Sequence, residues 1–151
     1  MTTILCPTRG GNESHPNQDF AINLARERDA DLLFLYVSNI QLIGRAGPPI
    51  VVDIEEELDE VGEFLLAMAQ ERAEKSGIHA ETAVRRGNFS KVLKKVIVEK
   101  GIHTVVLGSS PKETGLVSKE HLQELSDILS KEMGVEFIVV QDGMMVFHIE
   151  T

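Results

Sequence analysis

The sequence contains little cysteine and no long hydrophobic run. Cys6 is the only cysteine among 151 residues, so no internal disulfide can form, as is typical of proteins from a reducing compartment. No apolar stretch approaches the ~20 residues that a membrane-spanning helix needs, and the first residues lack the basic and apolar segments of an export signal. We therefore expect a soluble, cytoplasmic protein in which Cys6 is a small buried strand residue.

Positive charge is also scarce. The chain carries 15 lysine and arginine residues against 24 aspartate and glutamate residues, which gives a formal net charge of -9. The electrostatic field of such a molecule repels phosphate backbones and anionic lipid unless basic residues are concentrated in one place. The basic runs are Arg85-Arg86 and Lys91 with Lys94-Lys95, and both are short. We predict that the protein binds neither nucleic acid nor membranes.

Apolar segments with the composition of strands alternate with segments of helical period along the chain. The predicted strands cover Thr3 to Pro7, Leu32 to Val37, Ala80 to Arg85, Thr104 to Leu107 and Phe137 to Val140. This alternation is typical of βαβ units. The sequence therefore predicts an α/β protein with a single domain over residues 1–151, built on an open parallel five-stranded sheet with helices on both faces.

Four helices fill the intervals between these strands, and the second, third and fourth each show a regular apolar period; the second serves as the example. Its apolar residues recur at alternating spacings of four and three, which predicts one stripe packed on the sheet. The stripe consists of Ile54, Leu58, Val61, Leu65 and Met68. Asp53 with Glu56 three residues later predicts a reciprocal cap at the start of this helix. Gly77, Gly101 and Gly134 each precede a β-branched residue, which predicts helix ends at all three positions.

The C-terminal segment predicts one more strand. Asp142-Gly143 separates two apolar runs, a pattern typical of a two-residue hairpin turn. A sixth, antiparallel strand would then form a hairpin extension over residues 142–151. This apolar strand would lie at or near the edge of the sheet, and exposed edges of that kind pair with other chains. We predict a homodimer through the C-terminal strands; the alternative is that Met144 to Ile149 folds against its own helices.

Several of these segments resemble the universal stress protein family. Ile4-Leu5-Cys6-Pro7-Thr8, followed by Arg9-Gly10-Gly11, is similar to the first strand and loop of that family. Leu33-Phe34-Leu35-Tyr36-Val37 is similar to its second strand. Val105-Val106-Leu107-Gly108-Ser109 and Phe137-Ile138-Val139-Val140 are similar to its fourth and fifth strands. The resemblance implies a Rossmann-like, adenine nucleotide alpha hydrolase-like sheet of order 3-2-1-4-5. It also implies a ligand cleft between the first and fourth strands and dimerisation through the last strand.

The ATP-binding motif of that family is broken in this chain. Family members that bind ATP have a glycine, two residues, a second glycine, nine residues, and then glycine with serine or threonine. Counted from Gly108, the second glycine is Pro111 and the final pair is His121-Leu122. Proline removes an amide donor and fills space that a phosphate would need. Arg9 stands where nucleotide-binding relatives carry an aspartate, so the charge in the first loop is reversed.

The candidate ligand site gathers residues from the first and fourth strand ends, and the ligand it suits is a small-molecule anion. Arg9, the backbone amides of two glycines, the hydroxyls of two serines and one lysine would meet at one cleft mouth if the first and fourth strands are neighbours. The family resemblance also implies that apolar and small residues would frame a base and ribose. The predicted site residues are Pro7, Thr8, Arg9, Gly10, Gly11, Val37, Leu107, Gly108, Ser109, Ser110 and Lys112. The alternative interpretation is ordinary turn chemistry in two exposed loops.

Three functions compete on this sequence. The first is a non-catalytic, regulatory stress-response module that acts as a homodimer without conventional ATP binding and without a cofactor. The second is a nucleotide- or anion-binding protein that holds ATP through a divergent loop in which Gly115 and Ser118 replace the missing positions. The third is an adenylating enzyme, because Gly10-Gly11-Asn12-Glu13-Ser14 is similar to a pyrophosphate loop. The five histidines show no paired metal-ligand spacing, so we predict no metal site and no catalytic residue.

Overall fold

The computed structural model describes residues 2–9, 14–38, 48–109 and 119–150, and the side chains of 48–58 lie outside this description. Within these residues, six strands and four helices follow one another in the predicted order, with the four helices between the five parallel strands. The strands are β1 (Thr3–Pro7), β2 (Asp31–Ser38), β3 (Ala80–Arg86), β4 (Thr104–Ser109), β5 (Glu136–Gln141) and β6 (Met144–Ile149). The helices are α1 (His15–Arg28), α2 (Pro48–Lys75), α3 (Phe89–Lys100) and α4 (Lys119–Met133). No helix within the described residues is both long enough and apolar enough to cross a bilayer.

The strands form one sheet in the order β3-β2-β1-β4-β5-β6. Pairing is parallel from β3 to β5, which confirms the predicted 3-2-1-4-5 order, and β6 runs antiparallel to β5. Asp142 and Gly143 have φ values of 53° and 79°. Two successive positive φ values are what a type I′ hairpin turn requires, so the predicted hairpin is confirmed together with its physical cause.

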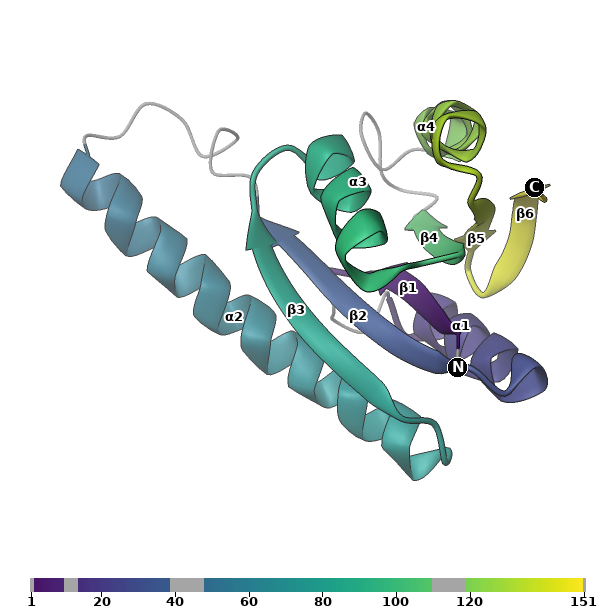
Figure 1. Cartoon of the computed structure of the whole chain (residues 1–151). Helices are drawn as coiled ribbons and strands as arrows, with labels where there is room; N and C mark the ends of the chain where they lie inside the picture. Colours follow the sequence, from purple (N-terminus) through teal and green to yellow (C-terminus); the bar gives the residue numbers. More distant parts are fainter. Residues whose placement is uncertain (1, 10–13, 39–47, 110–118, 151) are drawn as a thin grey trace.

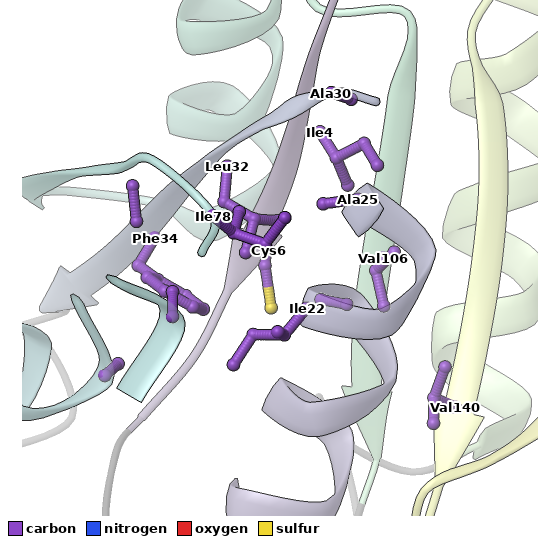
Figure 2. Packing of buried hydrophobic residues seen from close by; sticks show 14 of the residues in the cluster. Ile4, Cys6, Ile22, Ala25, Ala30, Leu32, Phe34, Ile78, Val106 and Val140 are labelled. Atoms are coloured by element: carbon purple, nitrogen blue, oxygen red, sulfur yellow. The ribbon is translucent and has the colours of Figure 1, made fainter. Parts of the chain in front are cut away.

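Alternate strand residues build two separate cores. On one face, Ile4, Cys6 and Phe34 pack with residues of α1 and α2, as Figure 2 shows around the Cys6 sulfur. On the other face, Leu5, Leu33 and Leu107 pack with residues of α3 and α4. Figure 1 shows the same division, with α1 and α2 on one side of the sheet and α3 and α4 on the other. The prediction of helices on both faces is therefore confirmed.

Glycines end three helices as the sequence predicts. Gly77, Gly101 and Gly134 have φ values of 82°, 61° and 67°, in the left-handed region that an L side chain disfavours. The β-branched residues that follow them are buried, with Ile78, Ile102 and Val135 exposed by 8%, 2% and 2%. Each packs back on the sheet and directs the chain into the next strand.

The predictions for the second helix were wrong in two respects. Helix α2 begins at Pro48, not near Asp53, so Asp53 lies inside the helix and does not cap its start. The physical reason is that proline is well suited to a first helical turn, where its missing N–H is not needed. In addition, Val61 and Met68 of the predicted sheet-facing stripe are 50% and 43% exposed, whereas Leu66 and Ala69 are 1% exposed.

Candidate functional site

Strands β1 and β4 separate at their carboxyl ends. Their paired register runs only through Ile4–Thr104 and Leu5–Val105. Beyond that point β1 continues to pair with β2 as far as Pro7–Leu35, and β4 continues with β5 as far as Ser109–Gln141. Chain connections leave these two neighbouring strands in opposite directions across the sheet, which is the place where open α/β sheets bind ligands. The reversal of chain connections between the first and fourth strands is therefore present. We refer to this position as the β1–β4 crevice, and its role as a ligand cleft stays a prediction.

Seven of the predicted site residues lie around this crevice. Pro7 ends β1, and Thr8 and exposed Arg9 follow it; Val37 belongs to β2; Leu107, Gly108 and Ser109 end β4. The other four, Gly10, Gly11, Ser110 and Lys112, lie outside the described residues, as do Gly115 and Ser118. The structure thus places the seven described residues at or near the carboxyl ends of β1, β2 and β4 and leaves their ligand-binding role as a prediction.

A chain of polar contacts centred on buried Gln18 lies on the β1 side of the crevice. The side chain of Gln18, which is 2% exposed, donates from Nε2 to Oγ1 of Thr8 at 2.9 Å. Arg72 of α2 donates to Oε1 of Gln18 and forms an ion pair with Asp19. The hydroxyl of Thr8 is therefore held by α1 and α2 of the protein itself. Gln18 lies on the same face of α1 as the buried residues Ala21 and Ala25. A glutamine at a buried position of an apolar helix face indicates a polar partner inside the protein, and this pattern could have predicted the contact with Thr8.

Asn17 closes the β4 side of the crevice. Its Nδ2 donates to the carbonyl of Ser109 at 3.3 Å, and its Oδ1 accepts from the backbone N–H of Gly143 at 3.0 Å. A Cβ added to Gly108 would lie 2.8 Å from the same Nδ2. The side chain of Asn17 thus covers Gly108 and ties the end of β4 to the β5–β6 turn. Sequence reasoning missed this residue, since nothing in the pattern indicates that residues 126 positions apart meet.

The Ser109 hydroxyl faces away from the crevice. Ser109 is 4% exposed, and its Oγ lies 3.4 Å from the carbonyl of Val140 and 3.3 Å from Oε1 of Gln141. The hydroxyl therefore serves the junction between β4 and β5, although the sequence predicted it as a ligand contact. The backbone and the Gly108 surface are what β4 presents to the crevice.

A shallow depression of about 290 Å³ lies on the other side of α1, away from the β1–β4 crevice. Its lining is mixed and contains two acidic residues of α1. It consists of Pro16, Asp19, Phe20, Asn23, Leu24, Glu27 and Gly143. Because Asp19 and Glu27 would repel a negative group, this depression does not suit the small-molecule anion predicted for the crevice.

A network of charged and polar groups joins four elements at the opposite end of the sheet, where β4 and β5 begin. Both guanidinium nitrogens of Arg28 contact Glu136, at 2.6 and 3.1 Å. Thr104 donates to Oε1 of Glu136 at 2.9 Å, and Nε2 of His148 lies 2.7 Å from Oε2. The hydrogen bond from Arg28, assisted by those from His148 and Thr104 and opposed by burial, lowers the pKa of Glu136 to about 2. The same pairing raises the pKa of Arg28.

Glu136, His148 and Glu150 have ligand atoms within 4.8 Å of one another, a spacing that would fit a metal ion. Arg28 already lies against both oxygens of Glu136. A divalent cation would have to approach that guanidinium, which is electrostatically unfavourable. The cluster is therefore explained as an ion-pair network that fastens α1, β4, β5 and β6 together.

Comparison with known proteins agrees with this architecture. The universal stress protein family model matches residues 1–124. Universal stress protein YxiE of Bacillus subtilis is 28% identical over 114 residues, which cover 70% of this chain and 77% of that protein. Among solved structures, universal stress protein UspA from Lactobacillus plantarum superposes with a TM-score of 0.73 at 17% identity, covering 92% of this chain and 97% of that one.

A universal stress protein from Arabidopsis thaliana, solved with AMP bound, superposes with a TM-score of 0.62 at 14% identity. The superposition covers 93% of this chain and 92% of that one. At these identities the structural matches establish the shared fold, while the family model covers most of the sequence. The chain belongs to the universal stress protein family.

Proposed function

We propose that this protein is a non-catalytic stress-response or regulatory module that does not bind ATP in the conventional manner. The observation that carries the proposal is the closure of the crevice by α1. Asn17 covers Gly108, the one glycine retained from the family's nucleotide motif, and Gln18 holds the hydroxyl of Thr8. A nucleotide approaching the strand ends would have to displace both contacts before gaining its own.

The sequence supports the same conclusion. Pro111 and His121-Leu122 replace the remaining positions of the motif. Proline removes one backbone amide donor, and the small residues that let the backbone approach a phosphate are missing at all three positions. Arg9 reverses the charge of the first loop. We also assign the protein to the cytoplasm, because its single cysteine is buried and cannot form an internal disulfide.

Isothermal titration calorimetry with ATP and Mg²⁺ tests this proposal. We expect no saturable binding up to millimolar nucleotide. The Asn17→Ala variant removes the side chain that covers Gly108, and it is the control that shows whether this side chain blocks the nucleotide. Its folding is verified by circular dichroism. Micromolar binding of ATP to the unmodified protein would contradict the proposal.

The second candidate is a nucleotide-binding protein with a divergent loop after β4. The observation in its favour is that relatives of the same fold have been solved with AMP and with cAMP. A monophosphate lacks the β- and γ-phosphates that the missing glycines would hold, so it is the better probe. Titration with AMP at micromolar affinity, abolished in Gly108→Val but retained in Gly77→Val, would favour this candidate over the first.

We also propose that the protein is a homodimer through β6. This strand is the last in the sheet order, and it exposes Met144, Met145 and Val146 by 72%, 53% and 39%. An apolar edge strand of this kind is suited to pairing with a second copy. In sedimentation velocity we expect a dimer that dissociates in Met145→Lys and persists in Val98→Lys, which alters an exposed apolar residue on α3. A monomer at micromolar concentration would contradict the proposal.

A further inference from the structure

Helix α2 has two apolar faces, and the sheet uses only one of them. Leu66, Ala69 and Ala73 are at most 1% exposed and pack in the core with β2 and β3. Gly62 is also buried, and a Cβ added to it would lie 2.6 Å from Cδ1 of the Tyr36 ring. The second face carries Val61, Phe64 and Met68, which are 50%, 66% and 43% exposed. We refer to these three residues as the outer stripe.

The direction of the outer stripe follows from helical geometry. At 100° per residue, Val61 and Met68 project from the same flank of α2 as Arg72. The guanidinium of Arg72 contacts Gln18 and Asp19, so this flank is turned toward α1. Phe64 lies further out, toward solvent. The outer stripe is therefore an exposed ridge along the flank of α2 that is turned toward α1, on the face of the sheet that α1 and α2 share in Figure 1.

The outer stripe is a continuous feature and not a scatter of single exposed side chains. Val98 on α3 and Ile128 on α4 are also exposed, but each is the only large exposed apolar residue of its helix within the described part of the chain. On α2 the spacing of three and four residues brings three apolar side chains together on adjacent turns. Exposed apolar patches of this kind mark sites of interaction with other proteins.

The charge around the outer stripe selects the kind of partner. Between Pro48 and Lys75 the sequence contains nine acidic residues and two basic ones. Exposed Glu60 and Glu71 are one helical turn from Phe64 and Met68, respectively, and border the outer stripe on its solvent side. The two basic residues, Arg72 and Lys75, are paired with Asp19 and Glu71. The surface is therefore an apolar ridge with an acidic border.

We propose that the outer stripe is a docking surface for a basic amphipathic helix of another protein. The apolar face of such a helix would cover Val61, Phe64 and Met68, and its flanking lysine or arginine residues would meet Glu60 and Glu71. A second copy of this chain does not fit, because two α2 helices side by side would bring two strongly acidic surfaces together. The surface is independent of the β1–β4 crevice and of the β6 edge.

Fluorescence anisotropy with a labelled synthetic peptide tests the proposal. The probe is an 18-residue peptide of leucine and lysine with a helical apolar period, and the control peptide has the same composition in a scrambled order. We expect saturable binding of the periodic peptide only, with an affinity that falls as salt is raised. Phe64→Glu should weaken binding by at least about tenfold, because such anchors dominate small interfaces. Ile128→Glu, which places the same charge on α4, should leave the affinity unchanged.

Three results would overturn the proposal. Equal binding of the scrambled peptide would mean that charge alone drives the association. An affinity unchanged by Phe64→Glu would place the peptide elsewhere on the acidic surface. Conversion of an oligomer to a smaller species by Phe64→Glu in sedimentation velocity would show that a second copy covers the outer stripe, a result distinguishable from dissociation caused by Met145→Lys at the β6 edge.

Discussion

The side-chain amide of Asn17 forms hydrogen bonds with two backbone groups that are far from it in the sequence. It joins the end of β4 to the β5–β6 turn through Ser109 and Gly143, and it covers Gly108. The absence of a side chain at Gly108 is what allows this approach. Because Asn17 and Gly108 are in close contact, the changes in unfolding free energy caused by substituting each of them should not be additive.

A double-mutant cycle on Asn17 and Gly108 measures that coupling. Asn17→Ala should destabilise the protein by about 1–2 kcal/mol, because two backbone groups lose their partner. Gly108→Ala should also destabilise it, because the new Cβ would lie 2.8 Å from Asn17 Nδ2. In the Asn17→Ala background, Gly108→Ala should cost clearly less. The measurement is urea unfolding of the four proteins, and strict additivity would rule out the contact.

Glu136 should make the protein acid-sensitive. Its pKa is lowered from 4.5 to about 2 in the folded state, so folding favours the ionised carboxylate. The stability it contributes is complete above about pH 4.5 and is lost as the pH falls toward 2. Allowing for partial solvent screening, this contribution is about 1–2 kcal/mol.

Urea unfolding between pH 7 and pH 2.5 tests this expectation. Glu136→Gln should be less stable than the unmodified protein at pH 7, and the difference should shrink below pH 4. Glu120→Gln, at an exposed carboxylate of α4, is the control and should lose no pH-dependent stability of this size. A stability difference for Glu136→Gln that stays constant across the range would refute the assignment.

At the scale of the elements, local signals predicted the strands and the hairpin well. Asp142-Gly143 predicts a turn by its own backbone preferences, and the glycines at helix ends act in the same way. Helix α2 shows where such reasoning fails. The sequence carries two apolar faces on this helix, and hydrophobic period cannot indicate which one meets the sheet. The small residues Gly62, Ala69 and Ala73 are buried because they allow α2 to approach the sheet closely.

The β5–β6 turn should depend on Gly143 for two separable reasons. Its φ is 79°, and a Cβ there would lie 3.2 Å from both Cβ and the carbonyl oxygen of Pro16. Gly143→Ala should therefore destabilise the protein by about 2 kcal/mol, combining backbone strain with a contact that must shift.

Gly77→Ala is the matched control for this prediction. Gly77 has a similar φ of 82° but open space around a Cβ, so its substitution should cost only about 1 kcal/mol for the backbone alone. Both variants are compared by urea denaturation. Equal losses of unfolding free energy in the two variants would mean that the contact between Pro16 and the turn does not affect stability.

The whole molecule consists of one sheet with an apolar core on each face. Cys6 lies in one of these cores, so the reactivity of its thiol indicates whether that core is closed. The thiol is buried beside α1, and burial raises its pKa to about 12. The thiolate is the reactive form, so a buried and protonated thiol should be inert in the native protein. Since β1 lies inside the sheet, Cys6 becomes reachable only when the sheet opens.

Thiol titration with Ellman's reagent at pH 8 tests this property. We expect no reaction within minutes in the folded protein and complete reaction in 6 M guanidinium chloride. A reaction that follows the unfolding equilibrium in intermediate denaturant would identify Cys6 as a probe of global opening. Rapid labelling of the native protein would show that the layer formed by α1 opens locally.

The sequence by itself determined the element order, the parallel sheet, the helix ends and the hairpin, because these depend on local backbone preferences and on which residues avoid water. The family resemblance also implied the strand order 3-2-1-4-5, and with it the reversal of connections between β1 and β4. Only the tertiary structure decided that Asn17 and Gln18 occupy the crevice, that Ser109 turns toward β5 and that α2 leaves an apolar face uncovered. Each of these depends on contacts between segments far apart in the chain, and no local pattern carries that information.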